Sequence, residues 1–333
     1  MAAELRAGNV RGLARAITLV EQRDPSVRHL LEALDDRQTR PAVVGFTGAP
    51  GTGKSTIVDG LVGLLRERDL AVAVIAVDPN SPYSGGAILG DRIRMQRHAL
   101  DSRVYIRSMG ARGHLGGLSA ATREAVRLLG AFGFDWVILE TVGVGQSELE
   151  VAAVADTTAV VLTPGLGDGV QMIKAGIMEI ADVFVVNKAD LPGAQKTVQE
   201  VRAMLSMGPR QSWRPPIVLT VAPKGEGTAD VIEAVERHRL HLESSGEASR
   251  RTEERLKDEA ADLVGEWARA EARRLLDREP GLAERLLRDG IPYGAAEAIL
   301  TQQGGELVPE EARKEQPTAP GDGEAGGHIM GSG

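Results

Sequence analysis

The stretch GAPGTGKST, Gly48 to Thr56, constrains the fold more than any other part of the chain. It matches the spacing G-x-x-x-x-G-K-[ST] and stands between the apolar run AVVGF and the amphipathic stretch IVDGLVGLLRER, an expected strand and an expected helix. Glycines let backbone N–H groups turn inward around a phosphate, and the amino end of a helix adds partial positive charge. We therefore expect a P-loop that joins a sheet strand to a helix and holds the phosphates of a nucleotide.

Two side chains of this loop carry chemistry. Lys54 is expected to reach the β- and γ-phosphates, and the Ser55 hydroxyl is expected to ligate Mg²⁺. The loop residues predicted to bind the nucleotide are Gly48, Ala49, Pro50, Gly51, Thr52, Gly53, Lys54, Ser55 and Thr56.

Short apolar runs alternate with helix-length segments from residue 41 onward. Most runs are rich in valine and isoleucine. Strands of this kind, apolar on both faces and separated by crossovers, predict an α/β fold with a mainly parallel sheet and helices on each side. Ligands of such sheets lie beyond the carboxyl ends of the strands. The runs are AVVGF, AVAVIAV, VYIRSM, DWVILE, TTAVVLT, DVFVVN and PIVLTV.

The sequence NKAD, Asn187 to Asp190, follows the run DVFVV and predicts the base. The Asp190 carboxylate can accept hydrogen bonds from both N1–H and the exocyclic amine of guanine, whereas adenine presents a different pattern of donors at that edge. A buried carboxylate left unpaired is costly, so we expect GTP and not ATP. The loop TVAPKGEG follows the last strand, and its backbone amides at residues 221–223 are expected to face the guanine oxygen. The residues predicted to bind the base are Asn187, Lys188, Asp190, Val221, Ala222 and Pro223.

Magnesium needs more oxygen ligands than Ser55 and two phosphates. Asp78 ends the run AVIAVD, Asp91 lies in GGAILGDRIRM, and Glu140 ends DWVILE. Because ligands of parallel sheets bind beyond the strand ends, Ser55, Asp78, Asp91 and Glu140 are the predicted metal residues. Both direct contact between Glu140 and the metal and contact through a bound water stay open at this point.

The loop after Glu140 has the features of a nucleotide-dependent switch. The Gly143 N–H is placed to sense a γ-phosphate, whose loss would release the loop. Val144, not a glutamine, follows Gly143, and Gln146 would need the loop to refold before it could orient an attacking water. We therefore expect slow hydrolysis by the chain alone, with Lys54, Glu140, Gly143 and Gln146 as the candidate catalytic residues.

The chain is expected to have four segments. They are a helical N-terminal extension (1–40), a nucleotide-binding G domain (41–245), a helical arm (246–302) and a disordered tail rich in Gly, Pro and Glu (303–333). A long helix is expected in the arm from Ser249 to Asp277, where Leu256, Ala260, Leu263, Trp267 and Ala270 recur at alternating steps of four and three. This seam favours self-association, although an amphipathic helix lying on its own domain shares the same short pattern.

Composition excludes several classes of function. The absence of cysteine excludes disulfides, thiolate zinc sites and thiol nucleophiles, and the net charge of −8 argues against a general electrostatic hold on nucleic acid or anionic lipid. The first residues lack the apolar core of a secretory signal, and no apolar run approaches the roughly 20 residues that span a bilayer, so we expect a cytoplasmic protein. Among the 6 histidines, only His238 and His241 stand at helical spacing, and we expect them on a solvated helix face.

Together these motifs resemble the MeaB/ArgK-type GTPases, the chaperones of adenosylcobalamin-dependent methylmalonyl-CoA mutase. The resemblance runs from about residue 10 to residue 300. Within the wider group of metal- and cofactor-chaperone GTPases, a glutamate replaces the aspartate of Ras-like proteins at this strand end, and Glu140 matches that pattern. The segments that carry the resemblance are GAPGTGKST, VDPNSPYSGGAILGDRIRM, SMGARGHLGGLS, ETVGVGQSE and TPGLGDGVQMIKAGIMEIADVFVVNKAD.

The resemblance implies a P-loop G domain with an N-terminal helical extension and a C-terminal arm that makes a homodimer. It implies that Asp91 completes the magnesium site from a first switch, and that residues 140–149 form a second switch. Residues 163–174, with Asp168 and Lys174, would form a third switch that communicates with the mutase. It further implies that GTP is hydrolysed slowly alone and faster with the mutase, so that the cycle gates cofactor loading and removal of damaged cofactor. Val221 departs from the family, which has a serine there.

Two other functions share parts of this pattern. A nickel-type metallochaperone GTPase would need clusters of histidine or cysteine to carry the ion, and the chain has no cysteine. A kinase or ATPase linked to amino-acid transport would prefer ATP, which NKAD opposes. The client, methylmalonyl-CoA mutase or a relative such as isobutyryl-CoA mutase, is left open by the sequence.

Overall fold

The computed structural model describes most of the chain, and several predicted residues lie outside the described part. The described residues are 1–34, 40–78, 95–98, 100–110, 117–141, 147–165, 178–207, 212–279 and the isolated positions 281, 284, 288, 296 and 298–300. The predicted residues outside them are Asp91, Gly143, Gln146, Asp168, Lys174 and the tail 303–333.

A parallel sheet of 7 strands forms the centre of the protein, in the order β3-β2-β4-β1-β5-β6-β7. Every neighbouring pair runs parallel, as the apolar runs separated by crossovers predict. The α/β fold with a parallel sheet is therefore confirmed. The strands are β1 (Ala42–Thr47), β2 (Val72–Asp78), β3 (Val104–Gly110), β4 (Trp136–Thr141), β5 (Thr157–Leu162), β6 (Val183–Asn187) and β7 (Ile217–Thr220).

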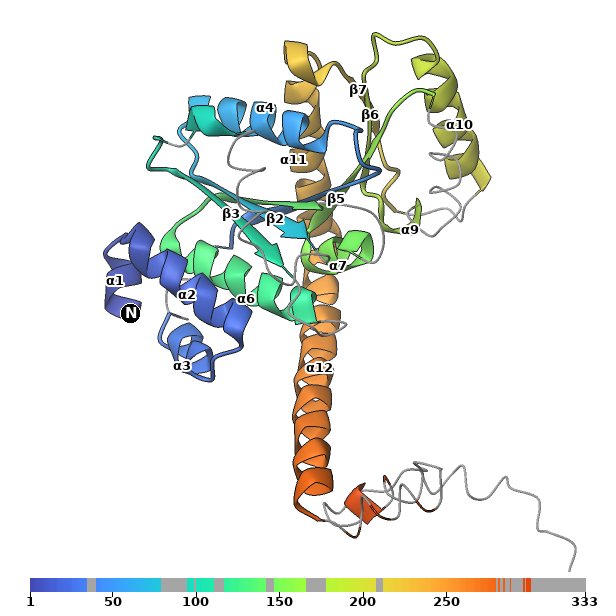
Figure 1. Ribbon diagram of the computed structural model, residues 1–333. Coiled ribbons are helices and arrows are strands. Elements are labelled where there is room, and N and C mark those ends of the chain that lie inside the picture. The colour runs from blue at the N-terminus through green and yellow to red at the C-terminus, as the bar shows by residue number, and fades with distance from the viewer. Residues whose placement is uncertain are drawn as a thin grey trace, which may run out of the picture. The chain divides into compact units, whose positions relative to one another are not determined.

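Helices cover both faces of the sheet, as Figure 1 shows. On one face α4 (Lys54–Glu67) and α11 (Thr228–Ser245) pack on the strands through a core that includes Ile57, Val185 and Val231. On the other face α6 (Gly117–Phe132) and α7 (Ser147–Val154) cover β1 to β4, while α10 (Ala194–Met207) packs on β5 and β6. The remaining short elements are η2 (Gln96–His98), α9 (Met178–Ile180) and η4 (Ala222–Lys224).

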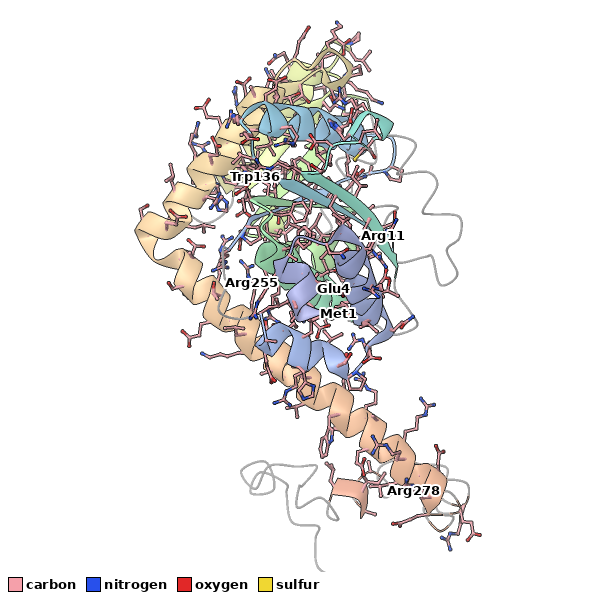
Figure 2. All side chains as sticks on the ribbon, turned by 90° about the vertical axis from the view of Figure 1, so that its left-hand side faces the viewer. Met1, Glu4, Arg11, Trp136, Arg255 and Arg278 are labelled. Atoms are coloured by element: carbon pink, nitrogen blue, oxygen red, sulfur yellow. The ribbon has the colours of Figure 1, made fainter. Side chains whose placement is uncertain are left out.

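The N-terminal helices α1 (Ala2–Arg6), α2 (Val10–Gln22) and α3 (Ser26–Glu32) share a core with the sheet. The Asn9 side chain caps α2 by accepting hydrogen bonds from the N–H groups of residues 11 and 12. Asp24 separates α2 from α3, because α2 ends before it and its carboxylate accepts a hydrogen bond from the Ser26 N–H at 2.9 Å. Glu4 of α1, labelled in Figure 2, pairs with Arg15 of α2 at 2.8 Å.

The chain divides into two compact units, Met1–Lys257 and Asp258–Gly333. The long helix α12 (Glu247–Arg278) confirms the helix expected from Ser249 to Asp277 and is slightly longer. No residue of this helix is buried, and its exposed apolar residues include Leu256, Leu263 and Trp267. Among the described residues no helix is both long and apolar enough to cross a membrane.

The first turns of α12 are tied to the amino ends of two neighbouring strands. Arg255, labelled in Figure 2, pairs at 3.1 Å with Asp156, which directly precedes β5. One turn earlier, Arg251 lies 3.4 Å from Asp182, which directly precedes β6. Arg40 also reaches Asp156, at 3.2 Å. Because these aspartates are at most 15% exposed, their ion pairs are shielded from water and fix where α12 begins.

The prediction that His238 lies on a solvated helix face is wrong. Its side chain is fully buried, with Nδ1 2.8 Å from the Thr157 hydroxyl and Nε2 3.2 Å from the Asp182 carboxylate. Burial and the nearby Arg251 lower the pKa of His238 to about 4. Burial raises the pKa of Asp182 to about 6, opposed by the hydrogen bond from the Thr158 N–H and by Arg251. At neutral pH the histidine is therefore neutral and the aspartate ionised.

We expect the free energy of unfolding to depend more strongly on pH in the Asp182→Asn variant than in the wild type. The pKa of His238 is lowered on folding, so its contribution to stability is complete above pH 6.5 and is lost as pH falls through about 4. The pKa of Asp182 is raised on folding, so its contribution is complete below pH 3.8 and is lost as pH rises through about 6. Between about pH 4 and about pH 6 the two contributions to stability change in opposite directions with pH, so they partly cancel in the wild type.

In the Asp182→Asn variant only the histidine slope remains, so the free energy of unfolding should fall more steeply than in the wild type from pH 6.5 to pH 4.5. Urea denaturation at several pH values measures this difference. The matched variant His238→Gln should show the opposite trend, with stability rising as pH falls. Parallel pH profiles for the wild type and Asp182→Asn would contradict the assignment.

Candidate nucleotide-binding site

The P-loop occupies the turn between β1 and α4, and two of its glycines are required by close contacts. Gly48 and Gly53 have φ of 139° and 92°, in the region that favours glycine. A Cβ on Gly48 would collide with the carbonyl oxygen of Val161 in β5, and a Cβ on Gly53 would collide with the amide nitrogen of Asn187. These are the two glycines that the motif G-x-x-x-x-G specifies, and here they let the loop lie against neighbouring strands.

Lys54 begins α4 and lies folded over the loop. Its side chain is only 7% exposed, and Nζ donates to the carbonyl oxygens of Gly48 at 2.6 Å and Ala49 at 3.2 Å. Thr52 closes the same turn by donating its hydroxyl to the Ala49 carbonyl at 2.8 Å. The cation is therefore held above the concave side of the loop, where a phosphate would replace the carbonyl oxygens as its acceptor.

Ser55 and Glu140 meet at the carboxyl end of the sheet. The Ser55 hydroxyl donates to Oε1 of Glu140, which β4 supplies directly beside β1 through the pairing of Phe46 with Glu140. The Glu140 carboxylate is 3% exposed, so its charge has lost most of its water. A hydroxyl beside a carboxylate at this depth is an oxygen donor set of the kind that Mg²⁺ prefers, and these two residues fit the ion.

The other predicted magnesium residues are located only in part. Asp78 is the last residue of β2, in the strand next to β4, and its backbone is two positions beyond the pairing of Ala76 with Glu140. Its side chain and the whole of Asp91 lie outside the described residues. Among the residues that the structure describes, no group of 3 or more His, Cys, Asp or Glu is arranged to hold a metal.

Asn187 connects the P-loop to the predicted base-binding loops. Its side-chain amide donates to the Thr52 carbonyl at 2.7 Å. Its side-chain oxygen accepts from the Thr220 hydroxyl at 3.0 Å and from the Ala222 N–H at 3.1 Å. Asn187 is 1% exposed, and its contacts are to the P-loop and to the end of β7 with the loop that follows it. One buried side chain therefore sets the relative positions of three loops that the sequence places far apart.

The two charged residues of NKAD point to different partners. Lys188 has φ of 56°, and its Nζ donates to the carbonyl of Gly51 in the P-loop at 2.9 Å. Asp190 pairs loosely with Lys224 at 3.7 Å, and both side chains are about half exposed. A carboxylate with such a weak partner is accessible to a ligand, as a base acceptor must be.

Two of the backbone amides predicted to face the guanine oxygen have partners within the protein. The Val221 N–H donates to the Glu226 carbonyl at 3.0 Å, and the Ala222 N–H donates to Asn187. Pro223 has no N–H to offer. The side chain of Val221 is buried. A contact from the Ala222 amide to a base would compete with the Asn187 oxygen, and one from the Val221 amide would compete with the Glu226 carbonyl.

Thr220 is a site residue that sequence reasoning missed. Its hydroxyl is 1% exposed and donates to Asn187, and its carbonyl accepts from the Ala189 N–H at 3.0 Å. The available signal was a polar residue at the end of an apolar strand, the same signal that singled out Glu140 in β4. Thr220 was not predicted because threonine is uncharged, whereas a buried charge such as that of Glu140 requires a partner.

A family model described as Methylmalonyl Co-A mutase-associated GTPase MeaB matches residues 13–275, from α2 through most of α12. The chain belongs to the MeaB family. The resemblance to MeaB/ArgK-type GTPases is thereby confirmed, and the P-loop, Asn187 and Glu140 all lie within the matched residues.

Relatives of this MeaB-family chain carry related names. A protein of Pyrococcus horikoshii, named as a GTPase, is 44% identical over 301 residues, which cover 89% of this chain and 95% of that protein. GTPase ArgK of Escherichia coli is 40% identical over 255 residues, covering 73% and 76%. The mouse protein named Methylmalonic aciduria type A homolog, mitochondrial is 37% identical over 265 residues, covering 73% and 64%.

A solved structure shares the fold of this MeaB-family chain. A protein described as LAO/AO transport system kinase has a TM-score of 0.64 and 28% sequence identity, with coverage of 91% of this chain and 96% of that chain. This similarity extends over nearly the whole chain and confirms a P-loop NTPase fold.

Proposed function

We propose that this protein binds GTP with Mg²⁺, hydrolyses it slowly alone and faster with its partner, and thereby gates the loading and protection of adenosylcobalamin in methylmalonyl-CoA mutase or a related acyl-CoA mutase. The observation that carries this proposal is the joining of the P-loop to NKAD through Asn187, with Glu140 on Ser55, in a chain of the MeaB family. The description of the family as methylmalonyl-CoA mutase-associated supports the choice of the mutase as partner.

Each residue of the site has a role in this proposal. Lys54 would exchange the Gly48 and Ala49 carbonyls for the β- and γ-phosphate oxygens, which neutralises charge where it develops. Ser55 and Glu140 would hold Mg²⁺, with Asp78 and Asp91 as further candidates. The ion supplies charge neutralisation at the phosphates. The glycines would bring backbone N–H groups against the phosphates without steric conflict.

Slow hydrolysis follows from the sequence of the loop after Glu140. Val144 stands where a water-orienting glutamine would follow Gly143, and Gln146 is further along. A partner that reorders this loop would supply what the chain alone lacks. We propose Gly143 as the sensor of the γ-phosphate and Gln146 as the candidate for orienting water once the mutase is bound.

Homodimer formation through α12 is part of the proposal. Three large apolar side chains of this helix are each more than half exposed: Leu256, Leu263 and Trp267. Exposed apolar side chains at this spacing are typical of a helix that packs against a second helix.

Replacement of Asp190 by asparagine should change the base preference. Asparagine presents a donor beside its single acceptor, so one of the two guanine hydrogen bonds is lost and a donor faces a donor. We expect the affinity for GTP to fall on the order of 10- to 100-fold and the affinity for xanthosine triphosphate to rise. Competition against a fluorescent GDP analogue measures both. Unchanged preference for GTP would remove Asp190 from the base site.

The same competition assay separates a GTPase from a transport-linked kinase, the alternative that the name of the structural relative suggests. If ATP displaced bound GDP as well as GTP does, the guanine assignment would fail. A nickel carrier would need a cluster of ligands, and the chain has no cysteine.

Replacement of Lys174 by alanine should reduce activation by the mutase while leaving GDP affinity intact. The family resemblance assigns Lys174, together with Asp168, to the segment that signals to the mutase and not to the nucleotide pocket. The measurement is the ratio of GTP turnover with and without methylmalonyl-CoA mutase, accompanied by GDP titration. Equal loss of GDP affinity would place Lys174 in the pocket and contradict this role.

Co-elution tests the partnership itself. The full chain and methylmalonyl-CoA mutase, mixed with GDP or with a non-hydrolysable GTP analogue, are expected to elute together in size-exclusion chromatography. Separate elution with every nucleotide, for this mutase and for isobutyryl-CoA mutase, would overturn the proposed function.

A further inference from the structure

A cavity of about 280 Å³ lies at the edge of the sheet, lined by Arg202, Leu205, Arg214, Pro215 and Ile217. The first two residues come from α10 and the others from the segment that enters β7. Ile217 begins β7, whereas the nucleotide loops follow the carboxyl ends of the strands. The cavity is therefore at the opposite end of the sheet from the P-loop.

The cavity has a rigid frame. Leu205 and Ile217 pack against the core that α10 shares with β5 and β6. Next to the cavity, Trp213 donates its indole N–H to the Asp182 carbonyl at 2.8 Å, and its ring centroid lies 4.9 Å from that of His238. The segment that carries Arg214 and Pro215 is thus anchored to β6 and α11, so the cavity is formed before any partner binds.

The cavity is positively charged in a chain of net charge −8. Arg202 and Arg214 are both exposed, and within the described part of the chain neither guanidinium pairs with a carboxylate. The carboxylate nearest in sequence on α10, Glu200, pairs with Lys196 at 3.9 Å. Among the described residues that line the cavity, none is acidic. Two guanidinium groups without acidic neighbours favour a carboxylate ligand, which each can bind through two parallel hydrogen bonds.

Exposed apolar residues extend the surface beyond the cavity. Leu219, two positions past Ile217 on the same strand face, is 37% exposed, and Met207 at the end of α10 is 82% exposed. Figure 1 shows α10 beside β6 and β7, and β7 is the last strand in the sheet order. Arginine and methionine among apolar residues, without lysine or glutamate, are typical of the centre of a protein interface.

We propose that this surface docks an acidic segment of the partner mutase. Carboxylates of that segment would sit between Arg202 and Arg214, and a neighbouring apolar side chain would pack on Leu205, Pro215 and Ile217. The identity of the partner rests on the proposed function, whereas the chemistry of the segment rests on the cavity. Because the cavity is remote from the P-loop, this contact holds the mutase independently of the bound nucleotide.

The test compares two double charge reversals in the full chain. R202E/R214E is expected to weaken the dissociation constant for methylmalonyl-CoA mutase by at least about 10-fold in biolayer interferometry, with either nucleotide. The control, R11E/R237E, makes the same change of net charge at two exposed arginines on α2 and α11, and Arg11 is labelled in Figure 2. It should stay within about twofold of the wild type, because rim charges distant from a contact contribute little. GDP affinity, unchanged in both variants, shows that they fold, and R202A/R214A replaces the reversal if it does not.

The outcomes separate this inference from the proposed function. If the wild type binds the mutase and R202E/R214E binds as well as the control, the docking surface is wrong and the proposed function stands. If the wild type does not bind the mutase, the proposed function fails and the docking inference fails with it. A change in the oligomeric state of R202E/R214E with unaltered mutase affinity would assign the surface to a second copy of this chain and overturn the inference.

Discussion

Replacing Lys54 with alanine is expected to lower the single-turnover rate of GTP hydrolysis by about 10³-fold. Lys54 is a buried cation that donates to two carbonyl oxygens of the loop that would cradle the phosphates. Its charge is therefore held where negative charge develops on the transferred phosphoryl group, and in a site with little water it acts strongly. Stopped-flow measurement of phosphate release, with enzyme in excess over GTP, gives this rate directly.

A matched lysine provides the control for this prediction. Lys196 is 80% exposed on α10, and its substitution by alanine should leave the rate unchanged. Circular dichroism of both variants establishes that they fold. A Lys54→Ala variant that hydrolyses GTP within tenfold of the wild type would contradict the role of this lysine in the site.

Replacing Glu140 with glutamine is expected to raise the Mg²⁺ concentration for half-maximal turnover by about 100-fold. Glutamine keeps the size of the side chain and can still accept a hydrogen bond from Ser55, but it removes the charge that a divalent ion would share. Because Glu140 is 3% exposed, that charge is poorly screened, and its removal should matter far more than at the surface.

The matched control for Glu140 is the exposed Glu233 on α11, whose replacement by glutamine should leave the Mg²⁺ titration unchanged. Turnover titrated with MgCl₂ at saturating GTP measures both variants. A Glu140→Gln titration that overlays the wild type would remove Glu140 from the metal site, and the Ser55 contact would then be purely structural.

Most of the fold was predictable because its signals are local. Each strand is an apolar run bounded by turn residues. The P-loop motif is expected only between a strand and a helix, so it predicts both neighbouring elements. Parallel pairing followed from the helix-length crossovers between the runs. The structure confirms the strands and the long helix of the arm.

His238 shows where a residue-by-residue interpretation fails. Val231, Val235 and Leu242 are buried on α11, and His238 occupies the same stripe at helical spacing. The helical spacing therefore predicts a core position for His238, but it does not predict which residues His238 contacts. Thr157 and Asp182 come from the amino ends of two strands that are distant in sequence, and only the folded chain brings them to the imidazole.

The site was predictable by residue type and less so by contact. The NKAD motif predicted that Asn187 belongs to the site. No local sequence pattern indicated that its side chain would form hydrogen bonds with Thr52, Thr220 and Ala222 at the same time. The amides of residues 221 and 222, which are predicted to face the base, likewise have partners within the protein that no local pattern indicates. Motifs identify groups able to do chemistry, and tertiary packing decides which of those groups are already occupied.

GTP turnover with and without methylmalonyl-CoA mutase tests the central proposal most directly. The full chain with Mg²⁺ and saturating GTP should hydrolyse slowly alone and at least about tenfold faster when the mutase is added in excess. The Lys54→Ala variant in the same assay shows that the phosphate comes from this site. A rate that no adenosylcobalamin-dependent mutase changes would contradict the proposal that this GTPase serves such an enzyme.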